Sequence, residues 1–201
     1  MSYHDHRVVG LVHGLDRRAD PPLVIRGGRR ATLVAGQNAG PLRGSSAADV
    51  IVGSATADVI DGRGGADRIC GRGGNDRLAG EGSDDLLDGE GGADRLFGGP
   101  GGDRLHGGRG PDRLRGDSGD DFLTGERGND RLDGDGGRDR FDGGPGSDRM
   151  NGGTGDDHFE TAGTRSDRVH CGPGRDFVRA DRLDRVSQCE RVRVMRRTPR
   201  R

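Results

Sequence analysis

The chain has 201 residues, of which 42 are glycine, 33% are charged and only 28% are hydrophobic, with one Tyr and no Trp. This composition excludes a conventional globular core, and no stretch reaches the roughly 18 apolar residues of a membrane helix, so no membrane span is expected. The 33 basic residues, all Arg, nearly balance 34 acidic ones and alternate with them, so no nucleic-acid partner is expected.

Residues 1–43 show no period and are expected to form a poorly ordered leader or linker. The first residues lack the charged-then-apolar pattern of a secretory signal, so export has to be inferred from other features.

Residues 44–160 repeat with a period of nine. Every ninth residue from Gly44 to Gly152 is glycine, which gives thirteen consecutive units without an insertion. In each unit the sixth residue is Asp and the eighth is apolar, as Asp76 and Leu78 are in the unit that begins at Gly71. Such strict phase favours a repetitive fold over low-complexity disorder.

Each unit predicts one tight turn and one very short strand. Glycines at the first and fourth positions are expected to supply the positive backbone angles of the turn, and the eighth residue is expected to point inward. Two units then make one coil of eighteen residues, so the thirteen units predict an all-β parallel roll of six and a half coils. The core would be a thin ladder, which by itself is unlikely to offset about 1–2 kcal/mol of backbone entropy per residue.

The sixth-position aspartates suggest what else stabilises the turns. Asp76 and Asp94, two units apart, would lie one strand spacing apart on the same edge of the roll, and like charges that close repel. Carboxylates beside backbone carbonyls form an oxygen cage that suits a hard divalent cation better than a thiolate- or imidazole-seeking metal.

These nonapeptides, such as Gly71-Arg72-Gly73-Gly74-Asn75-Asp76-Arg77-Leu78-Ala79, resemble the glycine-aspartate calcium-binding repeats of the repeats-in-toxin (RTX) family. The resemblance implies a right-handed parallel β-roll that binds several Ca²⁺ ions between turns, folds where calcium is abundant and is extracellular. The expected calcium ligands, with backbone carbonyls of the turns, are Asp67, Asp76, Asp85, Asp94, Asp103, Asp112, Asp121, Asp130, Asp139, Asp148 and Asp157.

The first two units depart from the pattern. Ala47 and Thr56 replace the fourth-position glycine there, so Asp49 and Asp58 are expected to be weak or absent ion sites in an amino-terminal cap. Ser83 makes the unit at Gly80 a further exception.

Arg is frequent at the seventh position. It is interpreted first as a solvated outer face that balances the carboxylates, and second as a surface that becomes cationic on calcium binding and adheres to anionic cell-surface polymers.

Residues 161–192 are expected to form an irregular carboxyl-terminal cap, and residues 193–201 a basic tail. Cys171 and Cys189 are eighteen residues apart, one full coil, where stacked Cα atoms lie about 5 Å apart. This spacing predicts a capping disulfide; the alternative is two buried thiols. Cys70 has no evident partner in the sequence.

No zinc-protease, serine-hydrolase or phosphate-loop motif occurs in the sequence, so no enzyme activity is expected. The leading hypothesis is a stand-alone, secreted calcium-binding protein. A surface adhesion module and the secretion or folding module of a larger exported hydrolase are the alternatives.

Overall fold

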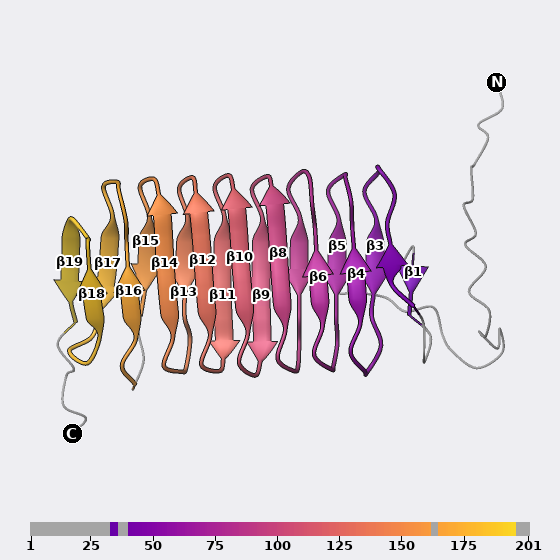
Figure 1. The fold of residues 1–201 in the computed structure, drawn as a ribbon. Helices are drawn as coiled ribbons and strands as arrows, with labels where there is room; N and C mark the ends of the chain where they lie inside the picture. Colours follow the sequence, from indigo (N-terminus) through magenta and orange to yellow (C-terminus); the bar gives the residue numbers. More distant parts are fainter. Residues whose placement is uncertain (1–32, 36–39, 162–164, 196–201) are drawn as a thin grey trace.

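The computed structural model describes residues 33–35, 40–161 and 165–195. Nineteen strands and no helix lie in these residues, so none of their elements is a helix that could span a membrane. The strands are parallel and stack as a β-solenoid of about nine turns (Figure 1). Consecutive strands along the chain belong to opposite sheets, so each coil contributes one strand to each sheet.

One sheet contains the ten odd-numbered strands in sequence order. They are β1 (Leu33–Val34), β3 (Val50–Val52), β5 (Arg68–Cys70), β7 (Leu86–Asp88), β9 (Arg104–Arg109), β11 (Phe122–Arg127), β13 (Arg140–Asp142), β15 (His158–Glu160), β17 (Phe177–Ala180) and β19 (Arg191–Val194).

The other sheet contains the nine even-numbered strands. They are β2 (Leu42–Arg43), β4 (Val59–Asp61), β6 (Arg77–Ala79), β8 (Arg95–Pro100), β10 (Arg113–Ser118), β12 (Arg131–Gly136), β14 (Arg149–Thr154), β16 (Arg168–His170) and β18 (Arg185–Ser187).

The predicted all-β roll with two units per coil is confirmed, and it is longer than six and a half coils. β1 and β2 lie in the segment expected to precede the roll and pair with β3 and β4. β16 to β19 extend the stack beyond Glu160. Beyond Glu160 the nine-residue spacing becomes irregular, and the coils there have unequal lengths, since Arg149 pairs with Arg168 and Arg168 with Arg185.

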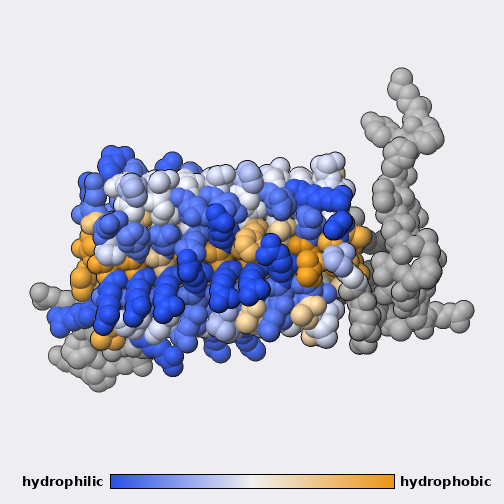
Figure 2. All heavy atoms as spheres, in the orientation of Figure 1, coloured by the Kyte–Doolittle hydropathy of each residue, from blue (hydrophilic) through white to orange (hydrophobic). Residues whose placement is uncertain are grey.

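The core is the predicted ladder of single apolar side chains. Each eighth-position residue from Ile51 to Phe159 is at most 2% exposed. Phe141 and Phe159 stack with ring centroids 4.5 Å apart. Most of the surface in view is hydrophilic, with a narrow band of hydrophobic residues along the roll (Figure 2).

The backbone angles correct one expectation about the glycines. Positive φ occurs at the fourth position, for example 124° at Gly110, but the other residue with positive φ is the second of the unit and not the first. In the eleven units from Gly62 onward the second residue always has positive φ, whether it is Gly99 (108°) or Glu126 (63°).

The first-position glycine is required for space. A β-carbon on Gly116 would lie 2.2 Å from Oδ2 of Asp121, the sixth residue of the same unit. In this unit the carboxylate therefore occupies the volume that a side chain at the first position would need.

Candidate metal centre

Two columns of aspartates run along the roll, one ahead of each sheet. Each aspartate directly precedes its strand, and its backbone N–H donates to Oδ1 of the aspartate one coil further on, as Asp94 N does to Asp112 Oδ1 at 2.8 Å. Fourteen such bonds link one column from Asp49 to Asp176 and the other from Asp58 to Asp184. The repeat of the sequence thus becomes two chains of coupled carboxylates.

The second carboxylate oxygen of most of these aspartates has no hydrogen-bond partner. In twelve of them Oδ2 is buried and accepts no hydrogen bond. They are Asp67, Asp76, Asp85, Asp94, Asp103, Asp112, Asp121, Asp130, Asp139, Asp148, Asp157 and Asp176. Buried acceptors without a partner are rare and unfavourable, so these oxygens are arranged for a ligand or a proton.

Burial raises the pKa of the carboxyl groups of the eleven aspartates from Asp67 to Asp157 in this set. Desolvation is the main cause, and the neighbouring aspartates add to it, while the backbone N–H bond opposes it. The pKa rises to about 7 for Asp76 and Asp121 and to about 6 for Asp67 and Asp148. The ionised column is therefore unfavourable by itself near neutral pH.

Backbone carbonyl oxygens lie close to the carboxylates, as the surroundings of Asp130 show. At Asp130, Oδ2 lies 2.5 Å from the point where Gly125 would carry a β-carbon, and the Gly143 carbonyl oxygen lies 2.8 Å from that point. Oδ1 and the Gly110 carbonyl oxygen lie 2.4 and 1.9 Å from the corresponding point at Gly128. All of these atoms are oxygens, the donor set that calcium prefers.

A cation here would depend on those carbonyls. Within the described ranges no three His, Cys, Asp or Glu side chains converge on one point. The arrangement fits Ca²⁺, which takes six to eight oxygen ligands in flexible geometry, better than a metal that needs several imidazole or thiolate ligands.

The first two units satisfy their carboxylates differently. Asp49 Oδ2 accepts hydrogen bonds from Ser45 N (2.7 Å) and Ser45 Oγ (2.9 Å), and Asp58 Oδ2 accepts them from Ser54 N (2.6 Å) and Ser54 Oγ (3.0 Å). These serines are the second residues of their units and do not have positive φ. Protein donors thus surround the two aspartates expected to be weak sites.

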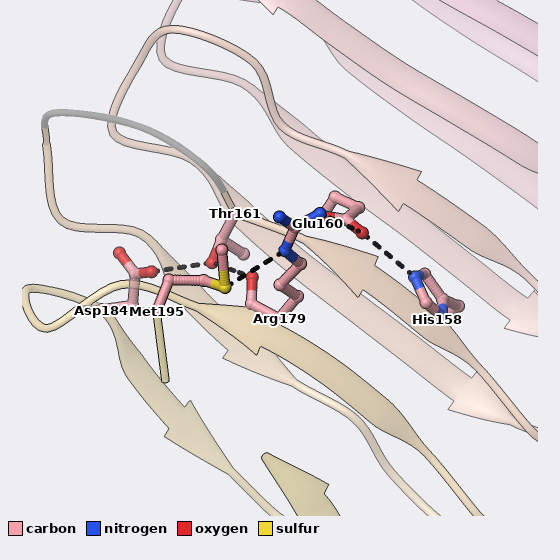
Figure 3. A network of polar contacts seen from close by, with 6 residues as sticks. All are labelled: His158, Glu160, Thr161, Arg179, Asp184 and Met195. Atoms are coloured by element: carbon pink, nitrogen blue, oxygen red, sulfur yellow. Dashed lines mark hydrogen bonds and ion pairs between the residues drawn. The ribbon is translucent and has the colours of Figure 1, made fainter. Parts of the chain in front are cut away.

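The far end has an analogous cap (Figure 3). Asp184 Oδ2 accepts hydrogen bonds from Thr161 Oγ1 and Asp181 N, both at 2.7 Å. In the same network Arg179 pairs with Glu160 at 3.3 Å, and Glu160 contacts His158 at 3.4 Å.

A disulfide completes this cap. It joins Cys171 and Cys189, whose Cα atoms are 5.1 Å apart. The third cysteine, Cys70 in β5, is a free thiol whose Sγ donates to Glu90 Oε1 at 3.1 Å.

The structure places all eleven predicted ligands along the two columns, and with them one further aspartate with an unpartnered Oδ2 that sequence reasoning missed. Asp176 is fully buried and its Oδ2 has no partner. The segment Cys171-Gly172-Pro173-Gly174-Arg175-Asp176 repeats the spacing of Gly98-Gly99-Pro100-Gly101-Gly102-Asp103 with Cys at the first position. That spacing was the available signal, and the substitution of the first glycine hid it.

Comparison with known proteins gives one match. The family described as RTX calcium-binding nonapeptide repeat (4 copies) matches residues 43–78, 71–105, 97–132 and 124–159. No curated protein matches the chain.

Proposed function

Because the chain belongs to the family of RTX calcium-binding nonapeptide repeat proteins, we propose that it is a secreted, non-catalytic β-roll that folds when calcium binds between its turns. Bound calcium would supply positive charge to the paired columns of carboxylates. The residues that would hold it are the twelve aspartates with an unpartnered Oδ2, including Asp176, together with carbonyl oxygens of the first and fourth residues of the turns.

The row of buried, unpartnered Oδ2 atoms is the observation that carries this proposal. Each of these oxygens is an acceptor removed from water without a hydrogen-bond donor. Repulsion from the neighbouring carboxylates of the same column makes its ionised form still less favourable. A divalent ion would provide the missing partner and remove the repulsion at once. Asp49, Asp58 and Asp184 already have protein donors and are proposed to remain free of ions.

Secretion is the setting in which these properties fit together. Extracellular calcium modules bind at about 10⁻⁴–10⁻³ M, so such a roll would stay unfolded at cytoplasmic calcium levels and fold outside the cell. The disulfide between Cys171 and Cys189 favours an oxidising compartment. An anionic cell-surface polymer is the partner that the exposed arginines would favour.

Circular dichroism during a calcium titration tests the proposal. The β-sheet spectrum should appear with calcium, should not appear with the same concentration of magnesium, and should be lost again on addition of EDTA. An identical spectrum and melting temperature in excess EDTA and in millimolar calcium would contradict it.

A further inference from the structure

The outer face of the even-numbered sheet carries an unbroken ladder of arginines. The seventh residue of each unit is Arg on seven successive strands, and each Arg is paired in register with the next. This arginine ladder consists of Arg77, Arg95, Arg113, Arg131, Arg149, Arg168 and Arg185. All seven side chains are exposed.

The odd-numbered sheet shows that the fold does not require this ladder. At the equivalent position its arginines are separated by other residues, since Leu86 stands between Arg68 and Arg104, and Phe122 between Arg104 and Arg140. Like charges directly opposite one another destabilise a sheet. The even face therefore retains an unfavourable column of charge that the odd face avoids.

Nearby acids leave most of the arginine ladder unneutralised. Among the described residues, the one ion pair of the ladder joins Arg131 to Asp133 at 2.8 Å, while Arg77 lies over the Phe97 ring at 4.2 Å.

A groove runs beside the carboxyl-terminal half of the ladder. It has a volume of about 460 Å³ and is lined by Arg131, Arg149, Arg168 and Arg185. Met150 and Val169 border it as well but are only 2% exposed, so its apolar surface comes mainly from the half-buried Val186. Asp133, Asn151, His170 and Ser187 contribute polar side chains, and Asp133 pairs with Arg131. The groove thus combines a row of arginines, of which one is paired with an acid, with hydrogen-bonding groups.

We propose that this groove binds an acidic polysaccharide, with sulfate or carboxylate groups on the arginines and sugar hydroxyls on the polar side chains of Asn151, His170 and Ser187. Successive arginines are about 4.8 Å apart, the spacing of paired strands, which is close to the length of one sugar ring. Guanidinium groups pair bidentately with carboxylates and sulfates, so each strand offers one anion subsite.

The same features disfavour a nucleic acid. In duplex DNA the phosphates of one strand advance about 3.4 Å along the helix axis and wind around it, so they do not form a straight row at the spacing of the ladder. Single strands are bound by aromatic platforms, and among the groove residues His170 is the one ring. The inference rests on the proposed function in one respect, because calcium has to fold the roll before the ladder exists.

Binding to heparin, a sulfated polysaccharide, tests this assignment on the full chain in millimolar calcium. The groove variant replaces Arg131, Arg149, Arg168 and Arg185 with Gln, and the control replaces the same number of arginines on the odd sheet: Arg68, Arg104, Arg140 and Arg191. We expect the groove variant to bind about tenfold or more weakly, with a shallower dependence on salt, and the control to bind within about twofold of the natural chain.

Calcium titration and melting of each variant separate this inference from the proposed function. Where the roll folds with calcium and yet does not bind heparin, the groove assignment fails and the calcium assignment stands. Equal losses in both variants, or equal affinity for heparin and an oligothymidylate, would also overturn it, because either result means unspecific charge attraction. A double variant, Arg149→Gln with Arg168→Gln, gives a smaller loss of the same kind should the quadruple variant not fold.

Discussion

The first two repeat units and the units that follow use the same aspartate in two ways. In both regions the backbone N–H of the aspartate donates to Oδ1 of the aspartate one coil further on, as from Asp49 to Asp67 and from Asp103 to Asp121. The difference lies in Oδ2, which Ser45 and Ser54 saturate in the first region and which has no partner at Asp67 and beyond. One carboxylate position can therefore be completed by the protein itself or left for an ion.

The second residue of the unit correlates with this difference. Where it is serine without positive φ, its N–H and hydroxyl both point to the carboxylate. Where it has positive φ, as Asp117 does at 77°, the Oδ2 of its unit accepts no hydrogen bond. The inner turns are thus shaped to leave an oxygen free, which a fold stabilised by protein contacts alone would avoid.

Acidification without calcium should have the largest effect on stability, through the inner units, those from Gly62 onward. Their aspartates have folded-state pKa values raised above the roughly 3.9 of an unfolded chain, to about 6 for Asp67 and about 7 for Asp112, so the folded roll binds more protons. This contribution to stability is fully present below about pH 4 and is lost as the pH rises through 6 to 7. In EDTA the β-sheet spectrum, which the chain should lack at pH 8, should therefore appear as the pH falls towards 5.

The same pH series in saturating calcium is the control for this effect. There, acid should raise the calcium concentration needed for folding, since protons compete for the same oxygens. A spectrum in EDTA that gains no β-sheet signal between pH 8 and pH 5 would show that the inner carboxylates are not the dominant groups.

The substitution Gly119→Ala should be the most damaging single change. Gly119 has φ of 130°, and a β-carbon there would lie 1.7 Å from the Gly101 carbonyl oxygen. The loss of stability should be about 3 kcal/mol or more, measured by urea unfolding in calcium. Ala47 already occupies the fourth position of the first unit, so Ala47→Gly should change stability by less than about 1 kcal/mol. Similar losses in both variants would remove the distinction between the two regions.

Isosteric amides should separate the two kinds of aspartate. Asp112→Asn keeps the Oδ1 acceptor for Asp94 N and removes a buried charge, so it should raise the calcium midpoint several-fold without lowering stability in EDTA at pH 5. Asp58→Asn places an amide against the two donors of Ser54, so the free energy of unfolding should fall by about 1–3 kcal/mol, both in calcium and in EDTA at pH 5. Circular dichroism and melting report both quantities, and the same calcium response in the two variants would contradict the comparison.

The smallest expected effect belongs to the serine hydroxyl. Ser54→Ala removes the Oγ bond to Asp58 but leaves the N–H bond. The free energy of unfolding should therefore fall by about 1 kcal/mol, and the calcium concentration at the midpoint of folding should not change. Ser147→Ala is a suitable control, since this exposed serine uses its backbone N–H to contact Asn129. Its stability should stay within about 0.5 kcal/mol of the natural chain. A calcium midpoint that falls in Ser54→Ala would mean that Asp58 is an ion site that the hydroxyl obstructs.

The nine-residue period was sufficient to predict the inward ladder from Ile51 to Phe159, the eighteen-residue coil and the stacking of Cys171 on Cys189. It could not predict positive φ at residues such as Arg63 or Glu81, because nothing in their chemistry favours that conformation and the neighbouring coils impose it. β1 and β2 were not expected because they lie outside the repeat. The arginine ladder was predictable in principle, since residues eighteen apart share a face.

The alternation of strands between two sheets limits how such a gene can change in length. Duplication of eighteen residues would add one coil and leave every downstream side chain on its original face. Duplication of nine would exchange the faces, so that a cationic column such as Arg131 and Arg149 would be split between opposite sides of the molecule. Lineages that depend on one face should therefore vary by pairs of repeats, with odd lengths confined to the ends.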